Sequence, residues 1–537
     1  MKKILFAATV AIGLLHTGCA GFLDEELKSS FAPSNTYTSS YGFEVGITGL
    51  YGYARSEYNT WGSAGTNTFF AHSQACPYES LQVATDIVYT GHKDGSLVPF
   101  ENLSYSTSSV YVTTYWNYAY GMIASANEIL SYSEKENVKW DKPGDKVRFQ
   151  AEARFFRAYA YRYLVYLYGD VPYVDKIEEK FRIDFTRTPK AEVLNKMVED
   201  LRFAVDNLPE DPDKVIPGKL TKWAAEHLLS EIYLLAGNYS AAETSARNVI
   251  NSGYFSLTKN RFGVVWDNPG DPFSDMFLEY NQNRNAGNRE SIWVIQLEYN
   301  TNGGGDANED WSRRAWVPKY WNIDGFVLAD SLGGRGLAQI VPLKWWINGE
   351  NFYTPTDMRN SEYNIKRNWY YNNPSSEKFG QKADITDESW NKAELCPAVT
   401  KFFYGKADNL SYNGANKDRI KSRLGETYLL LAEALIQQDK QTEAAEAINV
   451  IRERANTSPI SAGEATIDFL LDERIRELVG EELRRLTLVR LGKLKERTLK
   501  YNPNTQNMKD YHALWPIPQS IIDSNTGSSF PQNEGYN

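Results

Sequence analysis

Apolar residues recur at helical spacing in several parts of this 537-residue chain. The clearest case is 222–257, where apolar positions line one face of a short helix, Gly237-Asn238 breaks the chain, and an alanine-rich face follows. Ser240, with Glu243 three residues later, has the pattern of a capping box at the start of the second helix. This segment therefore predicts two helices folded against each other.

A second helical hairpin of the same kind is predicted over 425–455. Both hairpins fit the tetratricopeptide (TPR) pattern, whose repeat is about 34 residues. A hairpin of this size cannot bury its apolar face alone, so several must stack. Spacing alone leaves open two unrelated hairpins in an ordinary α protein. In either case the chain builds a helical scaffold, and scaffolds of stacked hairpins usually bind rather than catalyse.

Two long segments lack this helical spacing. Residues 56–112 and 256–417 are rich in Gly, Asn, Ser and aromatic residues, which is typical of loops, and 291–297 is a candidate strand. The fold class expected is mainly α, with TPR-like helical hairpins and a loop-rich, partly β, ligand-binding lobe. Helices are predicted at 43–54, 110–133, 147–168 and 189–208, and the region 418–497 is also predicted to be helical.

Composition changes this picture in two ways. Aromatic residues make up 14% of the chain, and nine of the 14 Trp fall in 256–417, so the irregular region carries most of the indoles. The formal net charge is −10 and Lys and Arg form no long run, which argues against a nucleic-acid partner. No internal segment has the roughly 18–20 uninterrupted apolar residues that a membrane-spanning helix requires.

The N-terminus predicts where the protein is located. Lys2-Lys3 and the apolar run 4–15 have the form of a secretory signal, and Thr17-Gly18-Cys19 resembles a lipobox, in which Cys19 is lipidated and becomes the new N-terminus. His16 departs from the usual Leu, and cleavage of a plain signal peptide near Ala20 is the alternative. Acyl chains would anchor the protein firmly to the outer membrane. The acidic turn at 24–26 is either an export signal to the cell surface or simply solvated.

Catalytic patterns are missing from the sequence. No HExxH or GxSxG motif occurs, and the glycine-rich run 331–336 lacks the Gly-Lys-Ser/Thr that holds phosphates. Residues 306–310 begin like a calcium loop but have Trp311 where the glycine is required. We therefore expect no enzyme activity, cofactor or metal. The Glu- and Arg-rich stretch 473–485 is expected to form ion pairs on a solvated helix face.

Aromatic loops suit carbohydrate binding, because the apolar faces of sugar rings stack on Trp and Tyr while their hydroxyls need polar partners. One stacked ring that buries about 80 Å² contributes about 2 kcal/mol, so several are needed. Ordinary packing remains an alternative for each ring; Trp116 and Trp293 are expected in the core, and a disulfide between Cys76 and Cys396 stays open. The candidate ligand-binding residues are Trp61, Tyr78, Tyr89, Asn308, Trp311, Arg313, Trp316 and Trp321.

Motifs along the mature chain, in matching order, resemble those of the SusD/RagB family. They are FLDEEL after Cys19, residues 157–173, RLGETYLLLAEA at 423–434, residues 449–455, residues 473–494 and the closing 514–536. Thr487 stands where the family has Asp, which puts one polar contact in doubt, and Glu534 stands where it has Pro. The resemblance implies four TPR-like hairpins, non-catalytic glycan capture at the cell surface, and a SusC-type TonB-dependent transporter as partner. A peptide- or other nutrient-binding lid of the same architecture is the alternative.

The expected organisation has five parts. A signal peptide (1–18) precedes a lipidated N-terminus and tether (19–42). An N-terminal helical region (43–255) is followed by an aromatic-rich irregular insert (256–417), and a C-terminal helical region with its tail (418–537) closes the chain.

Overall fold

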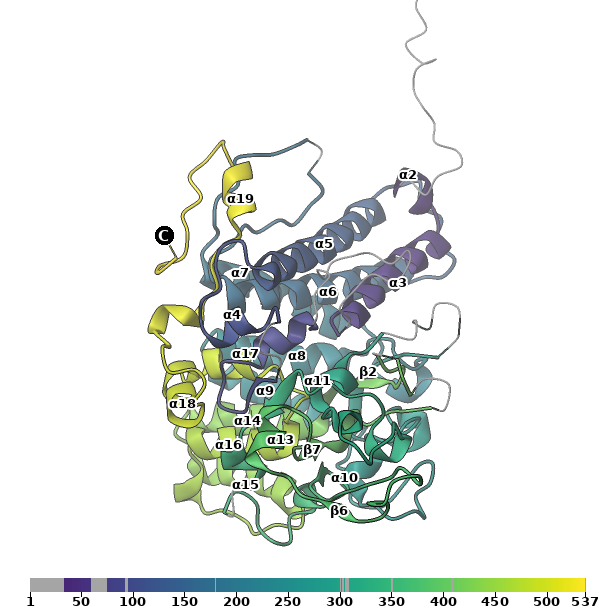
Figure 1. Ribbon diagram of the computed structural model, residues 1–537. Helices are drawn as coiled ribbons and strands as arrows, with labels where there is room; N and C mark the ends of the chain where they lie inside the picture. Colours follow the sequence, from purple (N-terminus) through teal and green to yellow (C-terminus); the bar gives the residue numbers. More distant parts are fainter. Residues whose placement is uncertain are drawn as a thin grey trace, which may run out of the picture.

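The protein is mainly α-helical (Figure 1). The computed structural model describes residues 33–58, 75–91, 95–178, 180–299, 301, 304, 309–348, 351–406, 410–412 and 414–536. The longer helices are α3 (Ser40–Ser56), α5 (Val110–Ser133), α6 (Asp145–Leu167), α7 (Lys190–Asn207), α8 (Lys222–Leu235), α9 (Tyr239–Ile250), α14 (Leu424–Ile436), α15 (Gln441–Arg454), α16 (Ile467–Leu478) and α18 (Leu494–Tyr501). The short helices are α2 (Pro33–Thr36), α4 (Val98–Glu101), α10 (Pro272–Asp275), α11 (Ser312–Trp316), α12 (Lys344–Ile347), α13 (Asp387–Asn391), α17 (Arg484–Arg490) and α19 (Gln519–Ser524).

The long helices stack one on the next, from α5 through α6, α7 and α8 to α9. The stack then continues directly onto α14, α15 and α16, although residues 251–423 lie between α9 and α14 in the sequence. Ala246 of α9 belongs to the same apolar cluster as Leu429 and Ala432 of α14. The prediction that the two hairpins stack is therefore confirmed. We call α5–α9 with α14–α16 the helical frame.

Local signals placed most frame helices to within a few residues, with one error in capping. Gly237 has a φ of 72°, as expected for the break between α8 and α9. The cap of α9, however, is Asn238, whose side chain accepts a hydrogen bond from Ala241 N at 3.2 Å. The capping box predicted from Ser240 and Glu243 is wrong, because the helix already begins at Tyr239.

The insert, residues 256–417, contains short strands and is joined to the rest of the chain by two strand pairs. β2 (Ser291–Ile295) pairs antiparallel with β8 (Arg419–Arg423), which leads into α14. β1 (Val88–Thr90) pairs antiparallel with β3 (Ile340–Pro342), which connects the N-terminal loop region to the insert. Two more pairs lie within the insert: β4 (Ile365–Lys366) with β7 (Ala398–Val399), and β5 (Trp369–Tyr370) with β6 (Lys382–Ala383).

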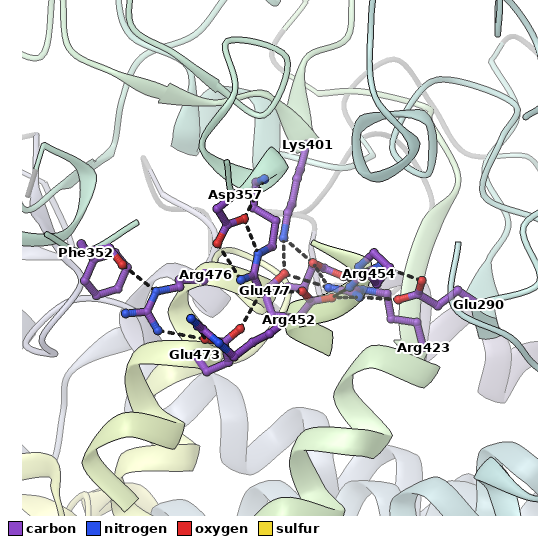
Figure 2. Close-up of polar contacts among 12 residues, drawn as sticks. Glu290, Phe352, Asp357, Lys401, Arg423, Arg452, Arg454, Glu473, Arg476 and Glu477 are labelled. Atoms are coloured by element: carbon purple, nitrogen blue, oxygen red, sulfur yellow. Dashed lines mark hydrogen bonds and ion pairs between the residues drawn. The ribbon is translucent and has the colours of Figure 1, made fainter. Parts of the chain in front are cut away.

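A buried cluster of ion pairs fastens the insert to the frame (Figure 2). Glu477 of α16 pairs with Arg423 at 2.6 Å, with Arg359 of the insert at 3.0 Å, and with Arg454 of α15. Glu473, one helical turn earlier, pairs with Arg359 at 2.8 Å. The glutamates and Arg359 are at most 1% exposed. Ion pairing was predicted correctly here, but the solvated helix face was wrong, because the insert covers this side of α16.

Three further features bear on the sequence predictions. None of the helices in the described ranges is long and apolar enough to cross a membrane. Cys76 and Cys396 are both buried free thiols and form no disulfide with each other. Trp116 and Trp293 are each 4% exposed, so their expected place in the core is confirmed.

Candidate functional site

The end of α3, the N-terminal loop region and the insert meet at one place. The backbone N–H of Trp311 donates to Tyr58 O at 3.0 Å, and Arg55 pairs with Glu309 at 3.0 Å. The pairing of β1 with β3 lies in the same two segments. The two aromatic regions that the sequence singled out therefore lie against each other, as a shared binding site requires.

A buried carboxylate fixes the base of this junction. Glu57 accepts hydrogen bonds from Lys421 Nζ at 2.9 Å and from the hydroxyls of Tyr159 and Tyr163. Burial alone would raise the pKa of the Glu57 carboxyl, but the nearby Lys421 and the two hydroxyls hold that pKa below its ordinary value. Glu57, which directly follows α3, is thus tied to α6 and β8 in the protein interior.

Two indoles of the insert are each covered by an arginine. The Arg314 guanidinium lies 4.2 Å from the ring centroid of Trp311, and Arg335 lies 5.5 Å from that of Trp321. Trp311 is 8% exposed, whereas Trp321, Arg314 and Arg335 are half-buried. We call these four residues the Trp–Arg cluster. The Trp321 ring offers a partly accessible apolar face, the Trp311 ring is almost fully covered, and the guanidinium groups carry N–H donors.

The glycine-rich run at 331–336 and the residue after it form hydrogen bonds with this cluster. Trp321 Nε1 donates to Gly336 O at 2.9 Å, and Leu337 N donates to Arg314 O at 3.0 Å. A Cβ at Gly336 would lie 2.0 Å from Val317 O, so only glycine allows this close approach. The run that lacked a phosphate-binding signature therefore has a structural role: it positions Trp321 and carries Arg335.

Four predicted site residues pack inside the protein instead. Tyr78, Arg313 and Trp316 are 0% exposed, and Tyr89 is 7% exposed. Trp316 stacks on Phe402 at 5.8 Å, and Arg313 donates to the backbone carbonyls of the 404–414 segment. In this structure their rings and guanidinium offer no open face, so we leave these four out of the site proposed below. Trp61 and Asn308 lie outside the described residues.

Most indoles of the insert are likewise buried. Trp346 and Trp369 are fully buried, and Trp390 is 3% exposed. Trp266 is the opposite case, at 59% exposure. A segment with few regular elements must fill its interior with large side chains, and this explains why an abundance of Trp could not by itself locate a binding surface.

Arg314 and Arg335 were missed by the sequence analysis. Arg314 stands next to Arg313, which was selected, but in a single helical turn neighbouring side chains point in different directions. Arg335 stands in the glycine-rich run that was judged only for phosphate binding. The signal that could have found Arg314 is its position three residues after the candidate indole Trp311, whereas Arg335 lies 14 residues after Trp321 and has no such signal.

Two cavities deserve comparison with this cluster. One of about 40 Å³ is lined by Arg313, Asp310 and Arg419, among others, and is too small for a sugar ring. Another of about 520 Å³ opens between residues 212–219 and 283–294, where Asp213 pairs with Arg284 at 3.2 Å and Arg289 at 2.8 Å. This second cavity, which we call the 212–294 cavity, is a rival location for a ligand.

Metal chemistry finds no support in the described part of the chain. There, no three His, Cys, Asp or Glu side chains gather in a way that could hold a metal ion. The Trp–Arg cluster itself contains neither a nucleophile nor a carboxylate. Stacking and hydrogen bonding are the interactions that these four side chains can offer.

Comparison with known proteins identifies the family. A family model described as "SusD family" matches residues 277–536, and one described as "Starch-binding associating with outer membrane" matches residues 71–234. The chain belongs to the SusD family. Among curated proteins, this SusD-family chain is 26% identical to SusD-like protein P2 of Formosa agariphila, with 100% of both chains covered. It is 24% identical to starch-binding protein SusD of Bacteroides thetaiotaomicron, covering 100% of this chain and 99% of that one.

Solved structures show the same fold. Surface glycan-binding protein A from Bacteroides thetaiotaomicron, in complex with laminarihexaose, aligns with a TM-score of 0.70 at 19% identity, covering 92% of this chain and 100% of that one. A laminarin-binding SusD-like protein aligns with a TM-score of 0.68 at 20% identity, covering 92% and 99%. The predicted SusD-like, mainly α fold is confirmed.

Proposed function

We propose that this SusD-family protein is a non-catalytic, glycan-binding lipoprotein of the cell surface. It captures poly- or oligosaccharides and delivers them to a SusC-type TonB-dependent transporter for import. The observation that carries the proposal is that two SusD-type family models match residues 71–234 and 277–536, the first of them described as starch-binding associating with outer membrane. Relatives named for starch or glycan binding align over nearly their full length.

The Trp–Arg cluster is the part of the structure that suits a glycan best. Trp321 presents a half-buried ring, and its indole N–H is already satisfied by Gly336 O, so the ring is held in place before a sugar arrives. A preorganised ring loses less conformational entropy on binding than a mobile one. Trp321 is therefore retained as a proposed ligand-binding residue, and Trp311, Trp61 and Asn308 stay predictions, the last two outside the described residues.

Electrophoresis of the protein lacking residues 1–19 through gels that contain polysaccharides tests this function. We expect one or more glycans to retard migration, and Trp321→Ala to weaken the binding about 30-fold, the loss of about 2 kcal/mol for one stacked ring. Trp266→Ala is the matched control, because this indole is 59% exposed in the same insert but outside the cluster. Absence of retardation across a broad panel, with binding of peptides instead, would favour the peptide-binding alternative.

The location and the partner need separate experiments. We expect Cys19→Ala to release the protein from the outer membrane fraction, because acyl chains supply most of the membrane affinity. Detergent extracts of the outer membrane should contain the wild-type protein bound to a TonB-dependent transporter. A Cys19→Ala protein that still sediments with membranes would refute the proposed anchor without affecting glycan binding.

A further inference from the structure

The Trp–Arg cluster also points to the chemical class of the ligand. Resting on the proposed function, we propose that the glycan bound at this site is anionic, and that Arg314 and Arg335 contact its negatively charged groups while Trp321 stacks on its rings. A uronate carboxylate and a sulfate ester share the chemistry that guanidinium groups recognise through paired N–H donors.

Arg314 is a cation without a carboxylate partner. Among the described residues it makes no ion pair, and its Nε is buried without a hydrogen-bond partner. The two carboxylates nearest in sequence are engaged elsewhere, since Glu309 pairs with Arg55 at 3.0 Å and Asp310 with Arg419 at 3.1 Å. A half-buried guanidinium in this state gains more from an incoming anion than a solvated one, because the local dielectric is lower.

The second arginine strengthens the positive potential at the same place. Burial lowers the pKa of Arg314 to about 10, and the like charge of nearby Arg335 adds to this shift. The Glu79 carboxyl is the acidic group that opposes this shift, yet it forms no ion pair with Arg314. Burial raises the pKa of the Glu79 carboxyl to about 8, so near neutral pH this group is largely protonated and leaves the cluster positive.

The stacked arrangement orients the charges toward a ring-bound ligand. Each guanidinium lies over an indole, so an anion that binds it is held beside an aromatic face. A sugar that carries a carboxylate or sulfate fits both requirements at once, whereas a neutral glucan uses only the ring. The whole chain has a net charge of −10, which means that the attraction is local to this site and is not a general affinity for polyanions.

Calorimetric titration with three defined polysaccharides tests the proposal. The probes are laminarin, which is neutral, polygalacturonate, which carries carboxylates, and κ-carrageenan, which carries sulfates. We expect an anionic probe to bind at least 10-fold more tightly than laminarin. Raising NaCl from 50 to 500 mM should weaken that binding about 10-fold, because salt screens the charges. Preference for polygalacturonate or for κ-carrageenan then distinguishes the two anionic groups.

Substitutions assign the effect to the arginines. Arg335→Gln should weaken binding of the preferred anionic probe about 10-fold and flatten its salt dependence, while Arg335→Lys retains most of both. Arg202→Gln, an exposed arginine on α7, is the matched control and should change neither. Arg314→Gln is expected to act like Arg335→Gln. If the half-buried position does not tolerate it, Arg335→Gln and the salt series still decide.

The failures of the two proposals can be told apart. If laminarin binds best and Trp321→Ala weakens it while Arg335→Gln does not, the anionic ligand is refuted and the glycan-binding function stands. If none of the probes binds, the anionic proposal is overturned, and if a broad neutral panel also fails, the glycan-binding function falls with it.

Discussion

The helical frame and the insert satisfy their backbone hydrogen bonds in different ways. In the frame, helices satisfy their own backbone hydrogen bonds, so small side chains such as Ala246 and Ala444 suffice to pack them closely. In the insert, backbone carbonyls need other donors. Lys417 Nζ donates to the carbonyls of Phe277, Lys401 and Phe403 at 2.8, 2.7 and 3.0 Å. An irregular lobe thus depends on buried cations and large rings for its own packing. Only the cations and rings that this packing does not use are available to a ligand.

The ion-pair cluster between frame and insert gives the largest expected effect. Glu477→Gln should lower the free energy of unfolding by about 3–5 kcal/mol, because Arg359, Arg423 and Arg454 would lose their shared carboxylate in a buried site. Urea denaturation measures this change. Lys392→Ala is the control: it breaks the exposed pair with Glu388 and should leave stability unchanged. Equal effects of the two substitutions would show that the cluster does not hold the insert.

Acid is expected to weaken the ion pairs between the helical frame and the insert. Burial would raise the pKa of Glu473, but Arg359 and its neighbours lower it to about 2, and arginines likewise keep the pKa of Glu477 well below 4.5. Stability from these carboxylates is complete above about pH 4.5 and is lost as the pH falls toward 2. The unfolding midpoint should be similar at pH 7 and 4.5 and fall at pH 3, and the midpoint of Glu477→Gln should fall less steeply. Parallel curves for the two proteins would disprove this linkage.

A smaller effect is expected within the insert itself. Gly336→Ala should cost about 1–3 kcal/mol in the free energy of unfolding, because the new Cβ would meet Val317 O at 2.0 Å. It should also weaken glycan binding, since Gly336 O holds the Trp321 indole. Gly463→Ala, where a Cβ would meet nothing within 4 Å, is the control. Unchanged glycan binding by a folded Gly336→Ala protein would show that the glycine-rich run does not position the binding site.

The smallest effect concerns one helix cap in the frame. Asn238→Ala should reduce stability by about 1 kcal/mol, because α9 would lose the side chain that accepts from Ala241 N. Ser240→Ala should have no such effect. Thermal unfolding of both variants checks the assignment, and a larger loss for Ser240→Ala would restore the capping box.

The frame could be predicted from sequence because its information is local. The spacing of apolar residues placed α5 at 110–133, and Gly237 marked the break between α8 and α9. The burial of Glu473 and Glu477 could not be predicted, because the groups that cover them, such as Arg359, come from a segment more than a hundred residues away. Charged residues on a helix look solvated until the partner surface is known.

The candidate site was harder for the same reason. Trp316 and Trp321 are equivalent in the sequence, yet one stacks on Phe402 inside the insert and the other remains half-buried beside Arg335. Nothing local distinguishes them, because the difference is made by contacts across the fold. Composition indicated that the insert carries rings, and only the structure shows which of them are still available.

Hydrogen exchange with and without the polysaccharide that is retained in gels tests the central claim most directly. We predict that ligand slows exchange in 311–322 and 331–337, the segments of the Trp–Arg cluster, and leaves α8, α9, α14 and α15 unchanged. Protection confined to the 212–294 cavity, or to the helices of the frame, would contradict the account and move the binding site elsewhere.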